Sequence, residues 1–412
     1  MLLGATAAAP VRGPGGRAAA RTRGPAATLG AVSVRSVLAR PVPAAAATAA
    51  AVLPLTLLVV LMWTLRAPAP IDYQWFGPGG DALLTARWGD VYRDPAVQAG
   101  AFELLPYGVA HLLGASGPVA WTVLLGGFAT AGAFLIALVL RPVLGTDLRS
   151  SVLAALATAA LGLAGTTETW LLGHPSEMLV PLVWVTAGRL ALRDRPALAA
   201  ALVALSSGFE VWGVLAAPVV LLAARPRLLR SAVSGIAVLA VLWLPFVLAG
   251  PFRMLSFAWA VAPQSLIASL APGMTSFPWS LRLLQSLLAI GAGTAVALLV
   301  RRRTSEWGPW LVVVAVVSGR LVLDPMTASY YGIPALIGAG GALVLAAHRA
   351  DLAALALSAA GLVLATDVGT PWVRAAALLA ITLLAAGGER WRQRRPVPPR
   401  RLGLRAGRIG LI

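Results

Sequence analysis

Carboxylates that could take part in chemistry gather in one stretch of this chain. Residues 67–117 hold five of the 15 acidic residues, namely Asp72, Asp81, Asp90, Asp94 and Glu103. The rest of the chain is strongly apolar, so acidic side chains are expected mainly where water has access. A carboxylate at such a place can act as a general base that removes the proton of a hydroxyl group. Asp72, which closely follows the first long apolar segment, is the candidate catalytic residue.

A second polar stretch contains Gly173-His174-Pro175-Ser176-Glu177. His174 could bind an anionic group or carry a proton. The same stretch is also typical of a helix start, with Ser176 as the capping residue and Glu177 in the first turn. The two interpretations are compatible, and His174 and Glu177 are candidates for substrate binding.

Two arginines are candidates for binding a phosphate group. Arg320 lies near the end of an apolar segment, and a planar guanidinium can hold phosphate through two hydrogen bonds. The alternative for Arg320 is a structural ion pair with Asp324, one helical turn away. Arg253, which follows Pro251 and Phe252, is the weaker phosphate candidate.

Three further residues complete the predicted substrate-binding set, namely Asp81, Tyr330 and Tyr331. Asp81 comes directly after Gly77-Pro78-Gly79-Gly80, a composition typical of a turn, and it also suits the cap of a following helix. Tyr330 and Tyr331 follow Asp324 closely.

The elements that must position these side chains are membrane helices. The chain has 412 residues, of which 59% are hydrophobic and 12% charged, and its mean hydropathy is +0.83. Apolar runs of about 20 residues, enough to cross a bilayer, recur along most of its length. These features predict an all-α, polytopic membrane protein. The chain has no cysteine, and it shows no P-loop, HExxH, GxSxG or Cys/His metal spacing, so we expect neither a metal nor a cofactor.

Arginines between the apolar segments predict the topology. The net charge of +18 comes entirely from arginine. A basic balance can indicate nucleic-acid binding, but arginines between spans follow the positive-inside rule, so no nucleic-acid partner is expected. About twelve membrane segments, with a range of about ten to thirteen, place the arginine clusters on one side. They are expected at 45–65, 118–140, 150–165, 177–192, 196–207, 210–223, 231–250, 278–300, 308–323, 329–347, 351–366 and 372–388.

Three regions follow from this topology in a plasma-membrane protein with both termini in the cytoplasm. Residues 1–43 form a disordered Arg-rich tail, residues 44–390 the membrane domain, and residues 391–412 a basic tail. The first loop, 67–117, is extracytoplasmic, and its parts 82–88 and 102–113 are amphipathic enough to lie along the membrane surface. The segments 196–207 and 210–223 are expected to form a broken or partly inserted hairpin.

The first loop also resembles that of a known family. An Asp outside the first span is followed by Gly80, Ala82-Leu83-Leu84, Trp88 and Val91-Tyr92. This pattern is similar to glycosyltransferase family 87, a group of GT-C membrane glycosyltransferases that includes polyprenol-phosphate-mannose-dependent α-mannosyltransferases. The order of spans matches over roughly residues 45–390. The family's late His-His stretch corresponds here to Tyr330-Tyr331.

The resemblance implies a GT-C helical bundle and an enzyme. It would transfer a sugar, with mannose expected, from a polyprenyl-phosphate-linked donor in the lipid bilayer to an envelope glycolipid or glycan acceptor outside. The family's first-loop Asp carries over onto Asp72 as general base. The alternative class is a transporter or flippase for an envelope lipid, but transporters tend to show internal repeats and ionisable residues at mid-membrane. The chain shows no convincing repeat.

Overall fold

The computed structural model describes residues 72–112, 114, 139, 174, 176–301, 306–326, 328–348, 351–365 and 370–392. The segments expected at 45–65, 118–140 and 150–165 therefore lie outside the described residues, apart from residue 139. The same holds for the predicted tails, apart from residues 391 and 392.

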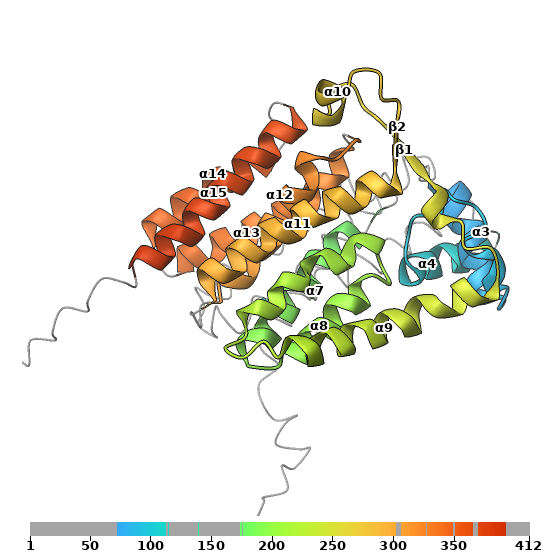
Figure 1. Cartoon of the computed structure of the whole chain (residues 1–412), viewed down its shortest axis with the longest axis horizontal. Coiled ribbons are helices and arrows are strands. Elements are labelled where there is room, and N and C mark those ends of the chain that lie inside the picture. The colour runs from blue at the N-terminus through green and yellow to red at the C-terminus, as the bar shows by residue number, and fades with distance from the viewer. Residues whose placement is uncertain are drawn as a thin grey trace, which may run out of the picture. The chain divides into compact units, whose positions relative to one another are not determined.

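The described chain is mainly helical (Figure 1). Its α-helices are α3 (Tyr73–Leu84), α4 (Ala101–Leu112), α7 (Ser176–Leu192), α8 (Pro196–Ser206), α9 (Leu228–Ala249), α10 (Leu266–Leu270), α11 (Trp279–Val300), α12 (Gly308–Val322), α13 (Ile333–His348), α14 (Leu352–Ala365) and α15 (Pro371–Arg392). Its 3-10 helices are η1 (Trp88–Asp90), η2 (Val211–Leu222), η3 (Met254–Ser256) and η4 (Ser329–Gly332). Strands β1 (Ala258–Ala260) and β2 (Ser276–Pro278) pair antiparallel, with Trp259 opposite Phe277.

The spans predicted within the described residues correspond to helices. Segments 177–192, 196–207 and 308–323 coincide with α7, α8 and α12 to within a residue at each end. Four described stretches are long and apolar enough to cross a membrane: Leu228–Ala249, Trp279–Val300, Tyr330–Ala347 and Pro371–Gly388. The first of these is α9, whose 22 residues would extend about 33 Å, close to the thickness of a hydrocarbon core.

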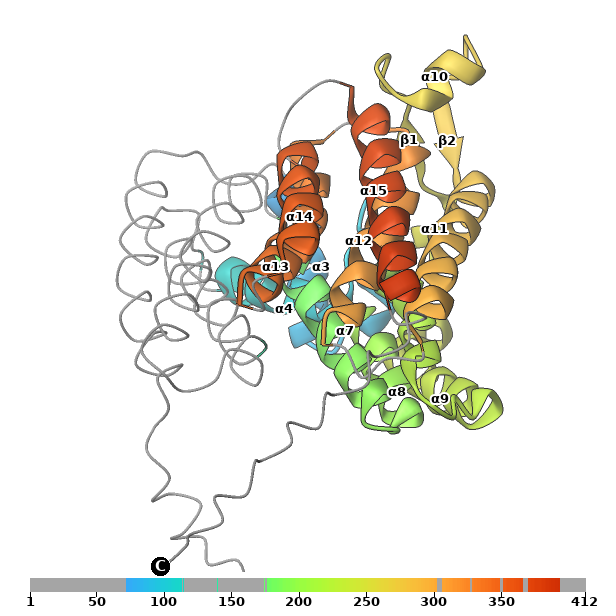
Figure 2. The same ribbon diagram turned by 90° about the vertical axis from the view of Figure 1, so that its left-hand side faces the viewer.

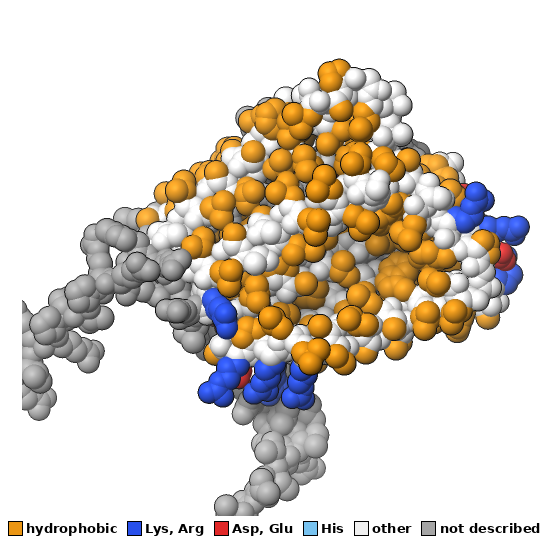
Figure 3. Space-filling view, viewed as in Figure 1, with side chains coloured by type: hydrophobic (Ala, Val, Ile, Leu, Met, Phe, Trp, Pro, Cys, Tyr) orange, Lys and Arg blue, Asp and Glu red, His pale blue; other side chains and the backbone are white. Residues whose placement is uncertain are grey.

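Charged side chains mark two edges of the described surface, with an apolar face between them (Figure 3). Five exposed arginines lie around the connections that precede α8 and α9, namely Arg193, Arg195, Arg225, Arg227 and Arg230. Three others lie in or near the first loop, namely Arg87, Arg93 and Arg253. Helix α9 runs from one edge to the other, because it begins after Arg227 and its C-cap Gly250 abuts Gly89.

Helix α12 forms the centre of the packing. All of its residues from Gly308 to Arg320 are buried. It contacts α11, α13, α15 and α7, and Figure 2 shows it beside α11 and α15. Apolar side chains around the whole circumference are expected of a helix enclosed on all sides. Arg320 lies at the end of this buried helix, so its partners must come from the surrounding helices.

The first loop folds differently from its predicted form. Gly77-Pro78-Gly79-Gly80 is not a turn, since it lies inside α3. Asp81 is not a helix cap, because it lies in the same helix, where Asp72 occupies the N-cap position. The glycines serve packing instead: a Cβ atom added to Gly80 would lie 2.2 Å from the carbonyl oxygen of Leu104 in α4. Of the two predicted surface helices, 102–113 corresponds to α4, whereas 82–88 is not one helix but covers the end of α3 and the turn that leads into η1. Helices α3 and α4 are in close contact.

The predicted hairpin is formed by α8 and η2. Its second half is a 3-10 helix of 12 residues, which is long for this type of helix. Trp184 in α7 donates its indole N–H to Ser206 Oγ and to the carbonyl oxygen of Gly213, at 3.1 and 2.7 Å. These contacts satisfy polar groups at the junction of α8 and η2, as irregular backbone within an apolar region requires.

Candidate functional site

A connected set of ionisable side chains lies where the first loop meets α7, η2 and α12. The first loop supplies Asp72 and Glu103, the segment that leads into α7 supplies His174 and Ser176, and Glu210 precedes η2. Glu177 of α7 extends the set towards Arg320 and Asp324 at the end of α12 and Arg282 in the first turn of α11. The set is on the first-loop side of the described helices, opposite the end of α7 that leads to Arg193.

Backbone hydrogen bonds fix the first loop to the connection between α8 and η2. The N–H groups of Gly100 and Phe102 donate to the carbonyl oxygens of Phe209 and Gly208, at 2.7 and 2.6 Å. Ala99 and Glu210 form an isolated antiparallel bridge. Glu103 is one turn into α4 from this junction, so the junction places its carboxyl group beside that of Glu210.

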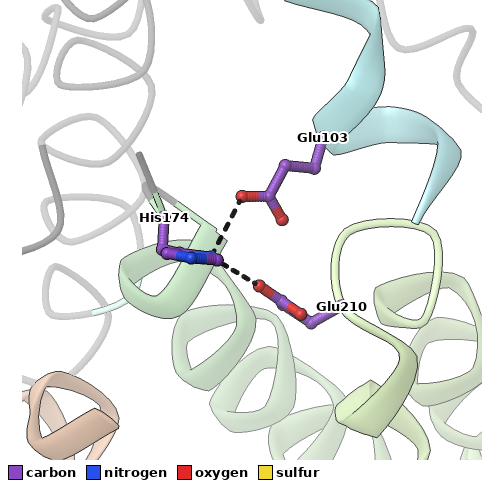
Figure 4. Close-up of side chains that lie close together, drawn as sticks. All are labelled: Glu103, His174 and Glu210. Atoms are coloured by element: carbon purple, nitrogen blue, oxygen red, sulfur yellow. Dashed lines mark ion pairs between the residues drawn. The ribbon is translucent and has the colours of Figure 1, made fainter. Parts of the chain in front are cut away.

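His174 is the centre of the acidic half of the site. Its Nε2 contacts Asp72 Oδ2. Its Nδ1 lies 3.9 Å from Glu103 Oε1 and 3.6 Å from Glu210 Oε1, and Figure 4 shows these two ion pairs. The ring stacks on Tyr330 with the two centroids 4.2 Å apart. The imidazole is therefore held on one face by an aromatic ring and at both nitrogens by carboxyl groups.

The hydroxyl group of Ser176 contacts both glutamates. Its Oγ lies 2.6 Å from Glu103 Oε2 and 2.9 Å from Glu210 Oε1. A serine hydroxyl has a single hydrogen to donate. Both contacts are hydrogen bonds only if one of the two carboxyl groups is protonated and donates to Ser176.

Electrostatics favours such a proton on Glu103. Burial and the neighbouring charge of Glu210 raise the pKa of Glu103 well above its usual value. Burial alone would lower the pKa of His174, but its close contacts with the carboxyl groups of Asp72, Glu210 and Glu103 outweigh burial and raise that pKa well above its usual value. The cluster thus stabilises positive charge between its carboxyl groups.

The basic half of the site is built around Asp324. Arg282 Nη1 donates to Asp324 Oδ2 at 3.0 Å, and Gln285 Nε2 donates to the same oxygen at 3.2 Å. Arg320 Nε lies 3.9 Å from that oxygen, while Arg320 Nη1 lies 3.8 Å from Glu177 Oε1. The structural pair between Arg320 and Asp324, considered from the sequence alone, is therefore a long contact inside a larger network.

Aromatic rings cover both guanidinium groups. The Arg320 guanidinium lies 4.3 Å from the ring centroid of Trp212 and 4.8 Å from that of Tyr331. The Arg282 guanidinium lies 4.2 Å from the ring centroid of Trp259. Arg320 Nη1 and Arg282 Nε are buried and have no hydrogen-bond partner among the described residues. Each arginine thus keeps one donor for a group that is not part of the described chain.

Six of the eight predicted site residues lie together: Asp72, His174, Glu177, Arg320, Tyr330 and Tyr331. The other two do not join them. Asp81 pairs with Arg87 at 2.6 Å near the far end of α3. Arg253 is exposed after α9, and its backbone N–H donates to the carbonyl oxygen of Tyr92.

Five residues of the network were not among the predicted site residues: Glu103, Glu210, Arg282, Ser176 and Asp324, the last of which was considered only as a structural partner of Arg320. Ser176 was predicted to cap α7, but it is the first residue of that helix, and its hydroxyl contacts two carboxyl groups instead. Arg282 could have been found by the rule that singled out Arg320, because it is also an arginine near the end of an apolar segment. Glu103 and Glu210 gave no comparable local pattern.

No protein-family model and no curated protein matches this sequence. The chemistry of the site is therefore argued from its residues. A carboxylate with 22% of its side-chain surface exposed, Asp72, lies beside a partly buried histidine, and two buried arginines with unused donors lie farther along the same network. Such an arrangement offers a proton acceptor and an anion-binding group close to one another.

Proposed function

We propose that the chain is a membrane glycosyltransferase that uses a polyprenyl-phosphate-linked sugar, with mannose the expected sugar, and transfers it to an envelope glycolipid or glycan. The observation that carries this proposal is the position of Asp72. It is the carboxylate of the His174 cluster that keeps the most exposed surface, at 22% of its side chain against 0% for Glu103 and 8% for Glu210. An acceptor hydroxyl could therefore approach it from outside the helices.

The two arginines are suited to the phosphate of the donor. Arg320 Nη1 and Arg282 Nε are N–H donors without a partner among the described residues, and guanidinium groups bind phosphate oxygens well. The helices around them are apolar on their outer faces, so a donor with a polyprenyl chain could remain in the bilayer. A donor of this kind is already activated, which agrees with the lack of any nucleotide-binding motif in the sequence.

In the proposed transfer step, Asp72 and the two arginines act on the acceptor hydroxyl and on the leaving lipid phosphate. The acceptor oxygen forms a bond to the anomeric carbon of the sugar, while the bond between that carbon and the phosphate oxygen breaks. The electron pair of the broken bond leaves with the lipid phosphate, whose charge the arginines stabilise. The proton of the acceptor hydroxyl passes to Asp72.

The arginine distribution supports an active site on the outer face. The exposed cluster of Arg193, Arg195, Arg225, Arg227 and Arg230 is expected on the cytoplasmic side. The site lies at the other end of α7 and α12, so it would open outside the cell. Both termini and the basic tails would then be cytoplasmic in a plasma-membrane protein.

The Asp72→Asn substitution tests the proposal. Purified protein in lipid nanodiscs would be supplied with a polyprenyl-phosphate-mannose donor and a membrane-glycolipid extract, and transferred sugar would be measured. Loss of a general base should lower the rate by about 100- to 10,000-fold while folding is retained. Asp81→Asn is the matched control, because Asp81 lies in the helix that Asp72 precedes, and the ion-pair partner of its carboxylate among the described residues is Arg87, outside the site. Near-normal transfer by Asp72→Asn would contradict the assignment.

A further inference from the structure

The acidic half of the site has the arrangement of a metal centre. One nitrogen and two carboxylate oxygens, from His174, Glu103 and Glu210, lie within 4.8 Å of one another. Figure 4 shows the three side chains pointing towards one another from separate elements. In a tetrahedral site with metal–ligand distances of about 2.0–2.2 Å, ligand atoms are about 3.4 Å apart. The 3.6 and 3.9 Å between His174 Nδ1 and the two glutamate oxygens are close to that spacing.

The hydrogen bonds around the three residues orient their atoms inward. Asp72 contacts Nε2 of His174, so in a neutral imidazole the ring hydrogen lies on that nitrogen and the lone pair lies on Nδ1. A carboxylate that binds the far nitrogen in this way is the usual outer partner of a metal-bound histidine. Ser176 positions the two glutamates, because its hydroxyl contacts Glu103 Oε2, which is turned away from His174, and Glu210 Oε1, which faces His174.

Two of the three atoms that face the centre lack hydrogen-bond partners, while the third, Glu210 Oε1, is contacted by Ser176. Glu103 Oε1 and His174 Nδ1 are buried without a hydrogen-bond partner among the described residues. The Glu103 side chain is 0% exposed, so this oxygen does not face bulk solvent. A buried carboxylate oxygen without a partner is strongly disfavoured unless positive charge is close to it.

The balance of charges in the whole network also favours a bound cation. Five carboxyl groups, those of Asp72, Glu103, Glu177, Glu210 and Asp324, are connected to three groups that can be cationic, namely His174, Arg282 and Arg320. As a metal ligand His174 is neutral, so with all five carboxyl groups ionised the two arginines leave three negative charges uncompensated, and a divalent cation would offset two of them. It would also occupy the point where a lone pair of His174 faces two carboxyl oxygens.

We propose that Glu103, His174 and Glu210 bind a divalent transition-metal ion, Zn²⁺ or Mn²⁺, and that Asp72 and Ser176 orient these ligands. An imidazole nitrogen suits zinc and related ions, while carboxylates suit manganese, so this mixed set favours an ion that accepts both. The sequence alone did not predict the site, because its ligands come from α4, from the segment before α7 and from the start of η2. The proposal concerns cation binding and does not depend on the transferase proposal.

Direct metal binding by the full chain in detergent, without donor or acceptor, tests this proposal. After treatment with a chelator, Mn²⁺ would be titrated and its binding followed by electron paramagnetic resonance, and Co²⁺ would be followed by its visible absorption. We expect saturation at one ion per chain. Glu103→Gln and Glu210→Gln should weaken binding by more than the roughly 10- to 100-fold expected for loss of an outer partner in Asp72→Asn. Asp81→Asn, which removes an acidic group outside the cluster, should leave binding unchanged.

A spectroscopic measurement covers the case in which the glutamate variants fail to fold. The chain has three histidines, at positions 111, 174 and 348. A double variant, His111→Asn with His348→Asn, keeps only His174, and bound Mn²⁺ should still show magnetic coupling to a ¹⁴N nucleus. Absence of binding to the wild-type chain, binding that the glutamate variants leave unchanged, or loss of the nitrogen coupling in the double variant would each overturn the proposal.

Discussion

At the scale of single residues, Asp324 is the carboxylate on which the basic half of the site depends. It contacts Arg282 at 3.0 Å and Arg320 at 3.9 Å, and its side chain is 2% exposed. Removing the negative partner of a buried ion pair leaves the positive groups uncompensated and destabilises proteins by about 3–5 kcal/mol. We therefore expect Asp324→Asn to lower the thermal unfolding temperature of the detergent-solubilised protein clearly.

Asp81→Asn is the control for that measurement. Asp81 pairs with Arg87, whose side chain is 52% exposed, and ion pairs at the surface contribute at most about 1 kcal/mol. Unfolding of the two variants would be followed by tryptophan fluorescence on heating. Equal unfolding temperatures for Asp324→Asn and Asp81→Asn would show that the buried network contributes no more to stability than a surface pair does.

A second prediction at the scale of single residues concerns Arg320, and it rests on the proposed phosphate site. Lysine keeps the positive charge of Arg320 but loses the planar fork and its stacking against Trp212 and Tyr331. Hydrogen bonds to charged groups contribute about 1.5–3 kcal/mol, so Arg320→Lys should raise the KM for the donor by about 10- to 100-fold. Arg253→Lys should leave that KM unchanged, since Arg253 is exposed and outside the network. If Arg253→Lys raised the KM for the donor and Arg320→Lys did not, Arg253 rather than Arg320 would be the residue that binds the phosphate.

The candidate site could be predicted from the sequence in part, for a physical reason. Each of Asp72, His174 and Arg320 can be recognised as a candidate on its own, because ionisable groups beside or within apolar segments are rare. Their partners could not be assigned, since Glu103 and Glu210 become neighbours only through the hydrogen bonds of Gly100 and Phe102 to the α8–η2 connection. Long-range contacts of this kind leave no local pattern in the sequence.

At the scale of the elements, the long apolar helices were predictable and the first loop was not. Helices α7, α8 and α12 begin and end close to their predicted positions because apolar runs and polar connections alternate there. In the first loop, the composition of residues 77–80 favours a turn by local preference, yet these residues are helical in α3. Tertiary contact with α4 outweighs the local preference, because small residues let the two helices approach closely.

The crossing of α3 and α4 gives the prediction for this scale. A Cβ atom at Gly108 would lie 2.3 Å from backbone atoms of Gly80, which cannot move aside as a flexible side chain would. Gly108→Ala should therefore force the helices apart and lower stability by about 1–3 kcal/mol. Because α3 begins next to Asp72 and α4 carries Glu103, we also expect lower activity from this variant. Thermal unfolding and the transfer assay check the two effects.

Gly291→Ala is the matched control for this crossing. Gly291 is also a helical glycine, in α11, but a Cβ atom there would have no neighbouring atom within 4 Å. Alanine is the better helix former by about 1 kcal/mol, so this variant should be as stable as the wild type or more so. If the Gly108→Ala and Gly291→Ala variants had the same unfolding temperature, the result would contradict the close approach of α3 and α4 at Gly108.

At the scale of the whole molecule, the two ends of the membrane helices differ in chemistry. Helix α7 runs from the candidate site at Ser176 towards Arg193, and α11 runs from Arg282 towards Arg301. Helix α12 runs in the opposite direction and brings Arg320 back to the site. The ionisable network and the exposed arginine cluster therefore lie on opposite sides of the apolar face, and from the positive-inside rule we expect the arginine cluster to face the cytoplasm.

Cysteine labelling tests this orientation, and the chain is well suited to it because it contains no cysteine. Thr85 and Ala224 are both exposed, the first just after α3 and the second in the connection between η2 and α9. In intact cells, a maleimide that does not cross membranes should label Thr85→Cys but not Ala224→Cys, and permeabilised cells should show labelling of both. Helix α9 begins at the η2–α9 connection and ends at Gly250, which abuts Gly89 of the first loop, so equal labelling of the two positions in intact cells would mean that α9 does not cross the membrane. Labelling of Ala224→Cys alone would instead reverse the orientation and place the candidate site in the cytoplasm, where a donor and acceptor on the outer face could not reach it.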